Sequence, residues 1–221
     1  MKKLLPVVII ALALWSCKNA KKEKTETTPL LEVKTIIDST LVTDSAWGAI
    51  TTKTDFAGLQ SIFGAANVKD ERICGPECID SLDVTIIYPE TNKEIIVHWK
   101  DSLYHKKIVY IETSGEEGPY RTPTGLKIGT TLRELLKLNG QKITFYGFGW
   151  DYGGYIQSYN SGTLEKSAVH FRLDLFSKSD DMSLLGDMEL NTDMPAVQKK
   201  LDSIQVYHLS LFFSKDALDE Y

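Results

Sequence analysis

Two stretches of the chain share one order of hydrophobic and polar positions. In the first, Phe56, Leu59 and Phe63 fall at helical spacing. Thr54 can cap this segment and Gly64 can end it, so a short amphipathic helix is predicted. Runs of β-branched and aromatic residues then predict three strands, at 84–88, 94–99 and 107–113. The first stretch therefore reads as a helix followed by three strands.

The second stretch repeats this order. Thr131 and Glu134 fit a capping box and Gly140 can end the helix. An apolar stripe is supplied by Leu132, Leu135 and Leu138. Gly64 and Gly140 lie 76 positions apart, and two apolar helix positions match at the same offset. Further strands are expected at 143–150, 154–159 and 168–175. The pattern predicts tandem helix-plus-three-strand units, with chance agreement between short patterns as the alternative.

The remaining residues predict a closing segment. Residues 177–193 are polar and acidic, which favours a long loop, and Asp193 with Pro195 is typical of a helix start. Residues 204–213 alternate as a strand does. Strands joined by short turns pair antiparallel, and each helix must cover an apolar sheet face. We therefore expect an α+β fold, a twisted antiparallel sheet with short helices on one face, with units at 46–120 and 121–213 and a polar tail at 214–221.

The first residues predict export. Lys2 and Lys3 precede an apolar run from Leu4 to Trp15, which is the pattern of a signal peptide. As a helix this run reaches only about 18 Å, whereas the hydrocarbon of a bilayer is about 30 Å thick. Residues 1–16 are therefore expected to be a signal peptide and not a membrane span.

The residues that follow the apolar run carry a second signal. Leu14-Trp15-Ser16-Cys17 resembles the lipobox of bacterial lipoproteins, although Trp15 replaces the small residue usual at its position. The resemblance implies that Cys17 becomes the mature N-terminus, with a diacylglycerol thioether and usually an amide-linked acyl chain. Several acyl chains hold a protein firmly on a membrane. An ordinary secretory signal with an incidental Cys17 is the alternative. In lipoproteins generally an Asp after the cysteine signals inner-membrane retention, so Lys18 implies an outer-membrane destination.

Charge and composition describe the part beyond the anchor. Residues 18–28 contain no large apolar residue, so 17–45 is expected to be a lipidated, flexible tether. The chain carries a net charge of −5, which argues against nucleic-acid binding. Without Lys2 and Lys3 the charge is −7, and without the +2 of residues 18–28 it is about −9. The expected partners are the membrane, through the lipid, and a protein of the cell envelope.

The tandem pattern over 46–175 looks like the repeats of the β-lactamase inhibitory protein and of the small lipoprotein of the outer-membrane barrel-assembly machinery. The likeness is one of architecture, and no residue signature of either family is carried over. It implies a sheet that binds another protein without catalysis.

Two further cysteines lie close together in the sequence, at Cys74 and Cys78. In an exported protein a disulfide is the expected state, and closing so small a loop stabilises by about 2 kcal/mol in the entropic model. The segment Cys-Gly-Pro-Glu-Cys is similar to thioredoxin's Cys-Gly-Pro-Cys, which raises the alternative of a redox pair. The extra Glu77 changes the size of the disulfide ring, and no long helix follows a strand here. A structural disulfide is therefore favoured, in the segment that lies between the first helix and the first strand.

Aromatic residues and glycines are concentrated at 145–155. Asp151 to Gly154 suits a hairpin turn, and alternation places Tyr146, Phe148 and Trp150 on one side with Phe145 on the other. Exposed aromatic clusters bind proteins or stack on glycans, whereas buried ones form core pairs. The proposed contact residues are Trp150, Tyr152 and Tyr155.

No motif predicts catalysis, a metal or a cofactor. The histidines at 98, 105, 170 and 208 are scattered, and the glycines of 147–153 do not match a phosphate-binding loop. An enzyme that uses Asp151 is the remaining alternative, but no paired base, nucleophile elbow or zinc motif accompanies it. We therefore expect a non-catalytic binding protein, with a glycan-binding or hydrolase-accessory module as the second hypothesis.

Overall fold

The computed structural model describes residues 37–75, 81–101, 103–176 and 182–214. These residues form an α+β fold with three helices, twelve strands and three antiparallel sheets. The small sheet at the start contains β1 (Val42–Thr43), β2 (Ala46–Trp47) and β3 (Ile50–Thr51). The expected fold class is confirmed.

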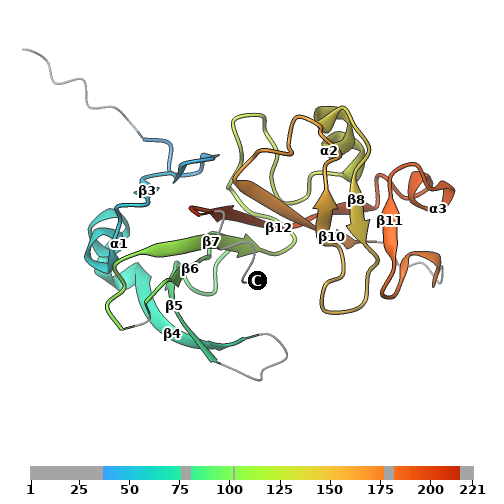
Figure 1. The fold of residues 1–221 in the computed structure, drawn as a ribbon. Coiled ribbons are helices and arrows are strands. Elements are labelled where there is room, and N and C mark those ends of the chain that lie inside the picture. Colours follow the sequence, from blue (N-terminus) through green and yellow to red (C-terminus); the bar gives the residue numbers. More distant parts are fainter. Residues whose placement is uncertain (1–36, 76–80, 102, 177–181, 215–221) are drawn as a thin grey trace, which may run out of the picture. The chain divides into compact units, whose positions relative to one another are not determined.

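The largest sheet has six strands in the order β10-β12-β7-β6-β5-β4 (Figure 1). All its neighbouring strands pair antiparallel. Its strands are β4 (Val68–Cys74), β5 (Ser81–Ile87), β6 (Ile95–Trp99), β7 (Ile108–Ser114), β10 (Val169–Leu175) and β12 (Ile204–Phe212). The last strand in the sequence, β12, pairs with β10 on one side and β7 on the other, so this sheet draws strands from both expected units.

The third sheet has the order β11-β8-β9. Its strands are β8 (Thr144–Tyr146), β9 (Ile156–Ser158) and β11 (Glu189–Asn191). The first two are shorter than the strands expected at 143–150 and 154–159. The expectation of a long loop at 177–193 is wrong in part, because β11 and the 3-10 turn η3 (Met182–Leu184) lie within it. Leu184 and Leu190 are buried there, and these isolated apolar residues anchor a segment that otherwise looks polar.

The three helices are short. They are α1 (Phe56–Phe63), α2 (Leu132–Asn139) and α3 (Pro195–Gln198). The capping box of Thr131 and Glu134 is present at the start of α2, as predicted. The other two caps are displaced by one residue: Asp55 caps α1 in place of Thr54, and Met194, which makes no side-chain cap bond, precedes α3.

The strand β4 was not expected from the sequence. Four consecutive charged residues from Lys69 to Arg72 hide its strand character, because an edge strand exposes much of its surface to water. Cys74 is the last residue of β4 and pairs with Ser81 of β5. The expected position between the first helix and the first strand is therefore corrected to the connection between β4 and β5. Cys78 lies outside the described residues, so the disulfide stays a prediction.

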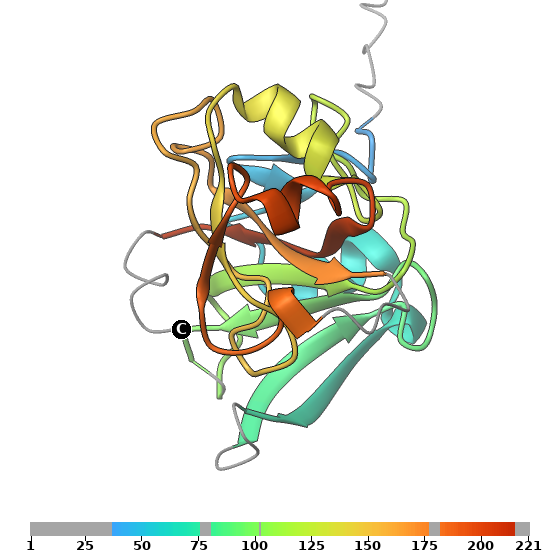
Figure 2. The same cartoon turned by 90° about the vertical axis from the view of Figure 1, so that its right-hand side faces the viewer.

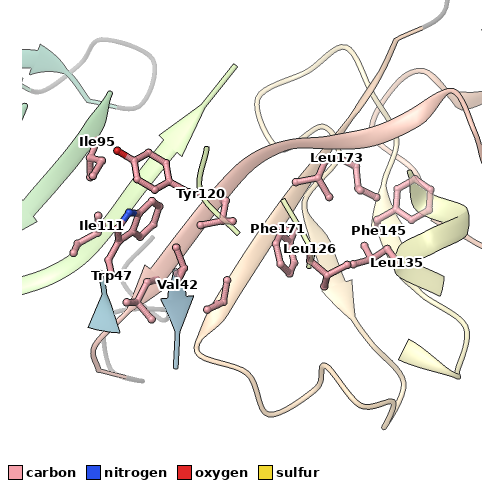
Figure 3. Packing of buried hydrophobic residues seen from close by; sticks show 14 of the residues in the cluster. Val42, Trp47, Ile95, Ile111, Tyr120, Leu126, Leu135, Phe145, Phe171 and Leu173 are labelled. Carbon is pink, nitrogen blue, oxygen red and sulfur yellow. The ribbon is translucent and has the colours of Figure 1, made fainter. Parts of the chain in front are cut away.

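One hydrophobic core runs beneath the six-stranded sheet. Trp47 and Tyr120 meet edge to face, with ring centroids 5.1 Å apart, on one side of this core. Phe145 and Leu135 belong to the same cluster of buried residues, among side chains contributed by residues 121–213 (Figure 3). Helix α2 packs against β12 (Figure 2), and a bridge between Tyr155 and Arg172 of β10 joins the aromatic segment to the strand at the end of the large sheet.

Candidate binding surface

Four aromatic side chains lie against one another where β8 turns back into β9. The ring of Trp150 contacts Tyr146 and Tyr152, with centroids 5.4 and 5.3 Å away. Tyr152 in turn approaches Tyr155 at 6.3 Å. We call Tyr146, Trp150, Tyr152 and Tyr155 the aromatic cluster. The structure thus brings together all three contact residues that the sequence singled out.

This cluster lies at the surface. The exposed fractions of Tyr152 and Tyr155 are 52% and 42%, while Tyr146 and Trp150 are half-buried. By contrast, Phe145 is 0% and Phe148 is 3% exposed, and their rings contact each other. The expectation that Phe148 shares a face with Tyr146 and Trp150 is therefore wrong. Strand β8 ends at Tyr146, so the alternation of faces does not continue to Phe148.

Two glycines allow this turn to approach the neighbouring chain. A Cβ on Gly154 would lie 1.8 Å from the carbonyl oxygen of Leu173 in β10, and the φ of Gly154 is +75°. A Cβ on Gly147 would lie 2.6 Å from the carbonyl oxygen of Gly186. Both contacts are too close for any residue with a side chain. Gly147 and Gly154 therefore permit the close packing of this turn against the neighbouring chain.

Arg172 of β10 fixes the backbone of this turn through hydrogen bonds. Its Nε donates to the carbonyl oxygen of Gly153 at 2.7 Å, and Nη2 donates to the carbonyl oxygen of Asp151 at 2.7 Å. The guanidinium carbon also lies 4.6 Å from the ring centroid of Tyr155. Trp150 is fixed separately, because its Nε1 donates to the carbonyl oxygen of Gly147 at 2.8 Å. The side chains of Trp150 and Tyr155 are thus held by contacts within the chain.

A second cluster of polar side chains spans three strands of the large sheet. The carboxylate of Glu112 on β7 lies 2.7 Å from Nε2 of His98 on β6 and 2.6 Å from Nε2 of His208 on β12. The ring of Tyr110 stacks on His98 at 3.9 Å with an interplanar angle of 10°. All these side chains lie on the sheet face opposite to Ile111, a fully buried residue of the hydrophobic core.

The charge state of this second cluster follows from its hydrogen bonds. Burial by itself raises the pKa of Glu112, but the hydrogen bonds from His208 and His98 outweigh burial and lower the pKa well below its usual range. Glu112 is therefore ionised, and an ionised carboxylate only accepts hydrogen bonds. Each histidine must donate its Nε2–H. The sequence suggested scattered histidines, and the detectable signal was a single His or Glu in each of three apolar strands.

No group of three or more His, Cys, Asp or Glu side chains among the described residues is arranged to hold a metal ion. Two open depressions of about 450 and 330 Å³ are lined by residues near Leu126, and neither is lined by a residue of the aromatic cluster. The aromatic cluster is therefore not part of the wall of either depression.

No protein-family model, curated protein or solved structure matches this chain. In the part of the chain that the structure describes, none of the helices has the length and apolar character needed to cross a bilayer. Cys17 lies outside the described residues, as Cys78 does, so the lipid anchor remains a prediction from the sequence.

Proposed function

We propose that this protein is a lipid-anchored lipoprotein of the cell envelope that binds another protein through the aromatic cluster and catalyses no reaction. The observation that carries the proposal is the exposure of Tyr152 and Tyr155 on a turn whose backbone is fixed by Arg172. Large apolar rings held at a surface offer binding area that a partner can cover. The anchor part of the proposal depends on the lipobox-like residues before Cys17.

The physical case for protein binding starts from the residue types. Trp and Tyr are enriched among the few interface residues that contribute most of the binding free energy. Binding also requires side chains to lose rotamer freedom, at about 0.5–1.5 kcal/mol for each one immobilised. The hydrogen bond from Trp150 and the guanidinium over Tyr155 already restrict these two rings. The cluster therefore loses less entropy on binding than free side chains would.

A glycan-binding module is the second candidate. Stacking on sugars uses a ring face that is open and flat. The planes of Trp150 and Tyr152 are inclined by 60°, those of Tyr152 and Tyr155 by 51°, and Arg172 lies over the ring of Tyr155. Rings inclined in this way do not form one flat stacking platform, which favours a protein partner.

Site-specific photo-crosslinking in the bacterium of origin tests the binding surface. A benzophenone side chain replaces Tyr152, and the matched control carries it at Tyr104, which is 68% exposed on a different loop. We expect a discrete protein adduct from position 152 that is weakened by Trp150→Ala and is missing at position 104. Equal adducts at both positions, or an adduct unaffected by Trp150→Ala in a folded protein, would refute this surface. Retention of sugars on a glycan array by the full chain would favour the second candidate.

Metabolic labelling with an alkyne fatty acid tests the anchor separately. The wild type should incorporate label and sediment with outer membranes, whereas Cys17→Ser should remain unlabelled. The matched control is Cys74→Ser, which removes a different thiol and should keep the label. A labelled Cys17→Ser protein, or a mature chain that begins elsewhere, would contradict the lipoprotein assignment.

A further inference from the structure

We infer that the aromatic cluster binds a cationic segment of the partner protein, one that presents Arg or Lys side chains to the rings. This inference rests on the proposed function, because it gives the chemistry of the partner at the same surface. It follows from the carboxylates around the cluster, from a cation already bound within the chain, and from the charge of the whole body.

Three acidic residues lie close to the aromatic cluster, along the chain or across the third sheet. Glu189 of β11 lies directly opposite Tyr146 of β8, and residues opposite each other in an antiparallel pair project to the same face. Asp151 lies between Trp150 and Tyr152 in the turn, and Asp187 lies two residues before Glu189. All three acidic side chains are exposed, and none forms an ion pair within 4.0 Å among the residues at 37–75, 81–101, 103–176 and 182–214.

The chain itself already shows a cation bound at this surface. The guanidinium of Arg172 lies over the ring of Tyr155 while its N–H groups are used by two carbonyl oxygens. A cation over a Trp or Tyr ring is attracted by the negative face of the π system. Arg172 lies over the ring of Tyr155, so the exposed ring of Tyr152 and the half-buried ring of Trp150 are available to a second cation. The positive charge of this second cation is compensated by Glu189, Asp151 and Asp187.

Long-range charge favours the same partner. The body beyond the stalk carries about −9, which attracts a basic segment and repels an acidic one. Charge complementarity of this kind mainly raises the association rate and selects the partner. The aromatic rings then provide the contact area. Binding should therefore weaken as salt concentration rises, since exposed ion pairs are screened.

Fluorine NMR of the full chain in detergent micelles, labelled with fluorotryptophan, tests the inference. The probe is a short peptide that alternates Arg with Gly, and the control peptide replaces each Arg by citrulline, which has the same shape but no charge. We expect the Arg peptide to shift the signal of Trp150, while the buried Trp47 and Trp99 serve as internal references. The citrulline peptide should bind at least about threefold more weakly, the size of one exposed cation–π contact.

Variants locate the charge effect. The double variant Asp187→Asn with Glu189→Gln should weaken binding of the Arg peptide about twofold to tenfold, since each exposed ion pair contributes little. The matched control, Glu71→Gln with Glu90→Gln, removes the same charge near strands β4 and β5 and should leave binding within about twofold. An equal loss in both double variants would refute a local site and leave only long-range attraction.

The outcomes separate the two proposals. A partner adduct at position 152 together with equal binding of the Arg and citrulline peptides would overturn the cationic partner and leave protein binding intact. A missing adduct together with no shift of Trp150 by either peptide would overturn both. Selective binding of the Arg peptide that is lost in Trp150→Ala supports the inference.

Discussion

The carboxylate of Glu112 should be one of the largest single contributors to folding stability, and Glu112→Gln removes its charge. The side chain accepts two short hydrogen bonds, at 2.7 and 2.6 Å, from histidines that are only 4% and 16% exposed. Hydrogen bonds to charged groups contribute about 1.5–3 kcal/mol each, and breaking a buried charged pair costs about 3–5 kcal/mol. Because Glu112 is itself 21% exposed, we expect a loss of about 3 kcal/mol in the free energy of unfolding.

The pH dependence has a definite sign. The pKa of Glu112 is lowered on folding from an ordinary value of 4.5. A carboxyl with a lowered folded pKa contributes stability that is fully present above its unfolded pKa and is lost as the pH falls toward the folded value. The difference between wild type and Glu112→Gln should therefore be largest near neutral pH and shrink below about pH 4.5.

Urea unfolding followed by circular dichroism at several pH values measures this difference. The matched control is Glu189→Gln, which also lies on a strand but is exposed and has no buried partner, so its effect should stay within about 0.5 kcal/mol. A Glu112→Gln protein as stable as wild type near neutral pH, or one whose deficit grows on acidification, would refute the reasoning from the two histidines.

Three further predictions concern local structure. Gly154→Ala should lower the free energy of unfolding by at least about 2 kcal/mol, because its Cβ would collide with the backbone of Leu173; chemical denaturation measures this, and a neutral effect would contradict the close approach. Arg172→Met should lower the free energy of unfolding by about 1–3 kcal/mol and speed amide hydrogen exchange in the turn, because it removes two hydrogen bonds to carbonyl oxygens. Unchanged stability and exchange would contradict this role of Arg172. Thr131→Ala should cost about 1 kcal/mol in thermal unfolding by removing the cap of α2, with exposed Lys137→Ala nearly neutral; equal effects would argue against the capping box.

Local patterns were sufficient wherever a few neighbouring residues decide the structure. The capping box of Thr131 and Glu134 and the glycine at 140 predicted α2, and the apolar runs predicted β6, β7 and β12 to within a residue or two. The turn at 151–154 was predicted from its glycines and is present. The three contact residues were chosen from residue type alone, and they do form one exposed cluster.

Tertiary structure decided the features that depend on residues far apart in the sequence. Arg172 supports the aromatic turn from a different strand, and its side chain gives no local signal of that role. Glu112 meets two histidines only because β12 inserts beside β7, and strand order is not encoded in the spacing of either segment.

The sequence by itself determined the short helices, most strands and the turn that carries the aromatic cluster, because propensity, capping and turn chemistry act over a few residues. Only the folded chain decided that Phe148 is buried, that Tyr152 is exposed and that an edge strand of charged residues completes the sheet. The reason is physical: burial and strand pairing depend on which distant segments cover a residue, and that information lies in packing between segments and not within any one of them.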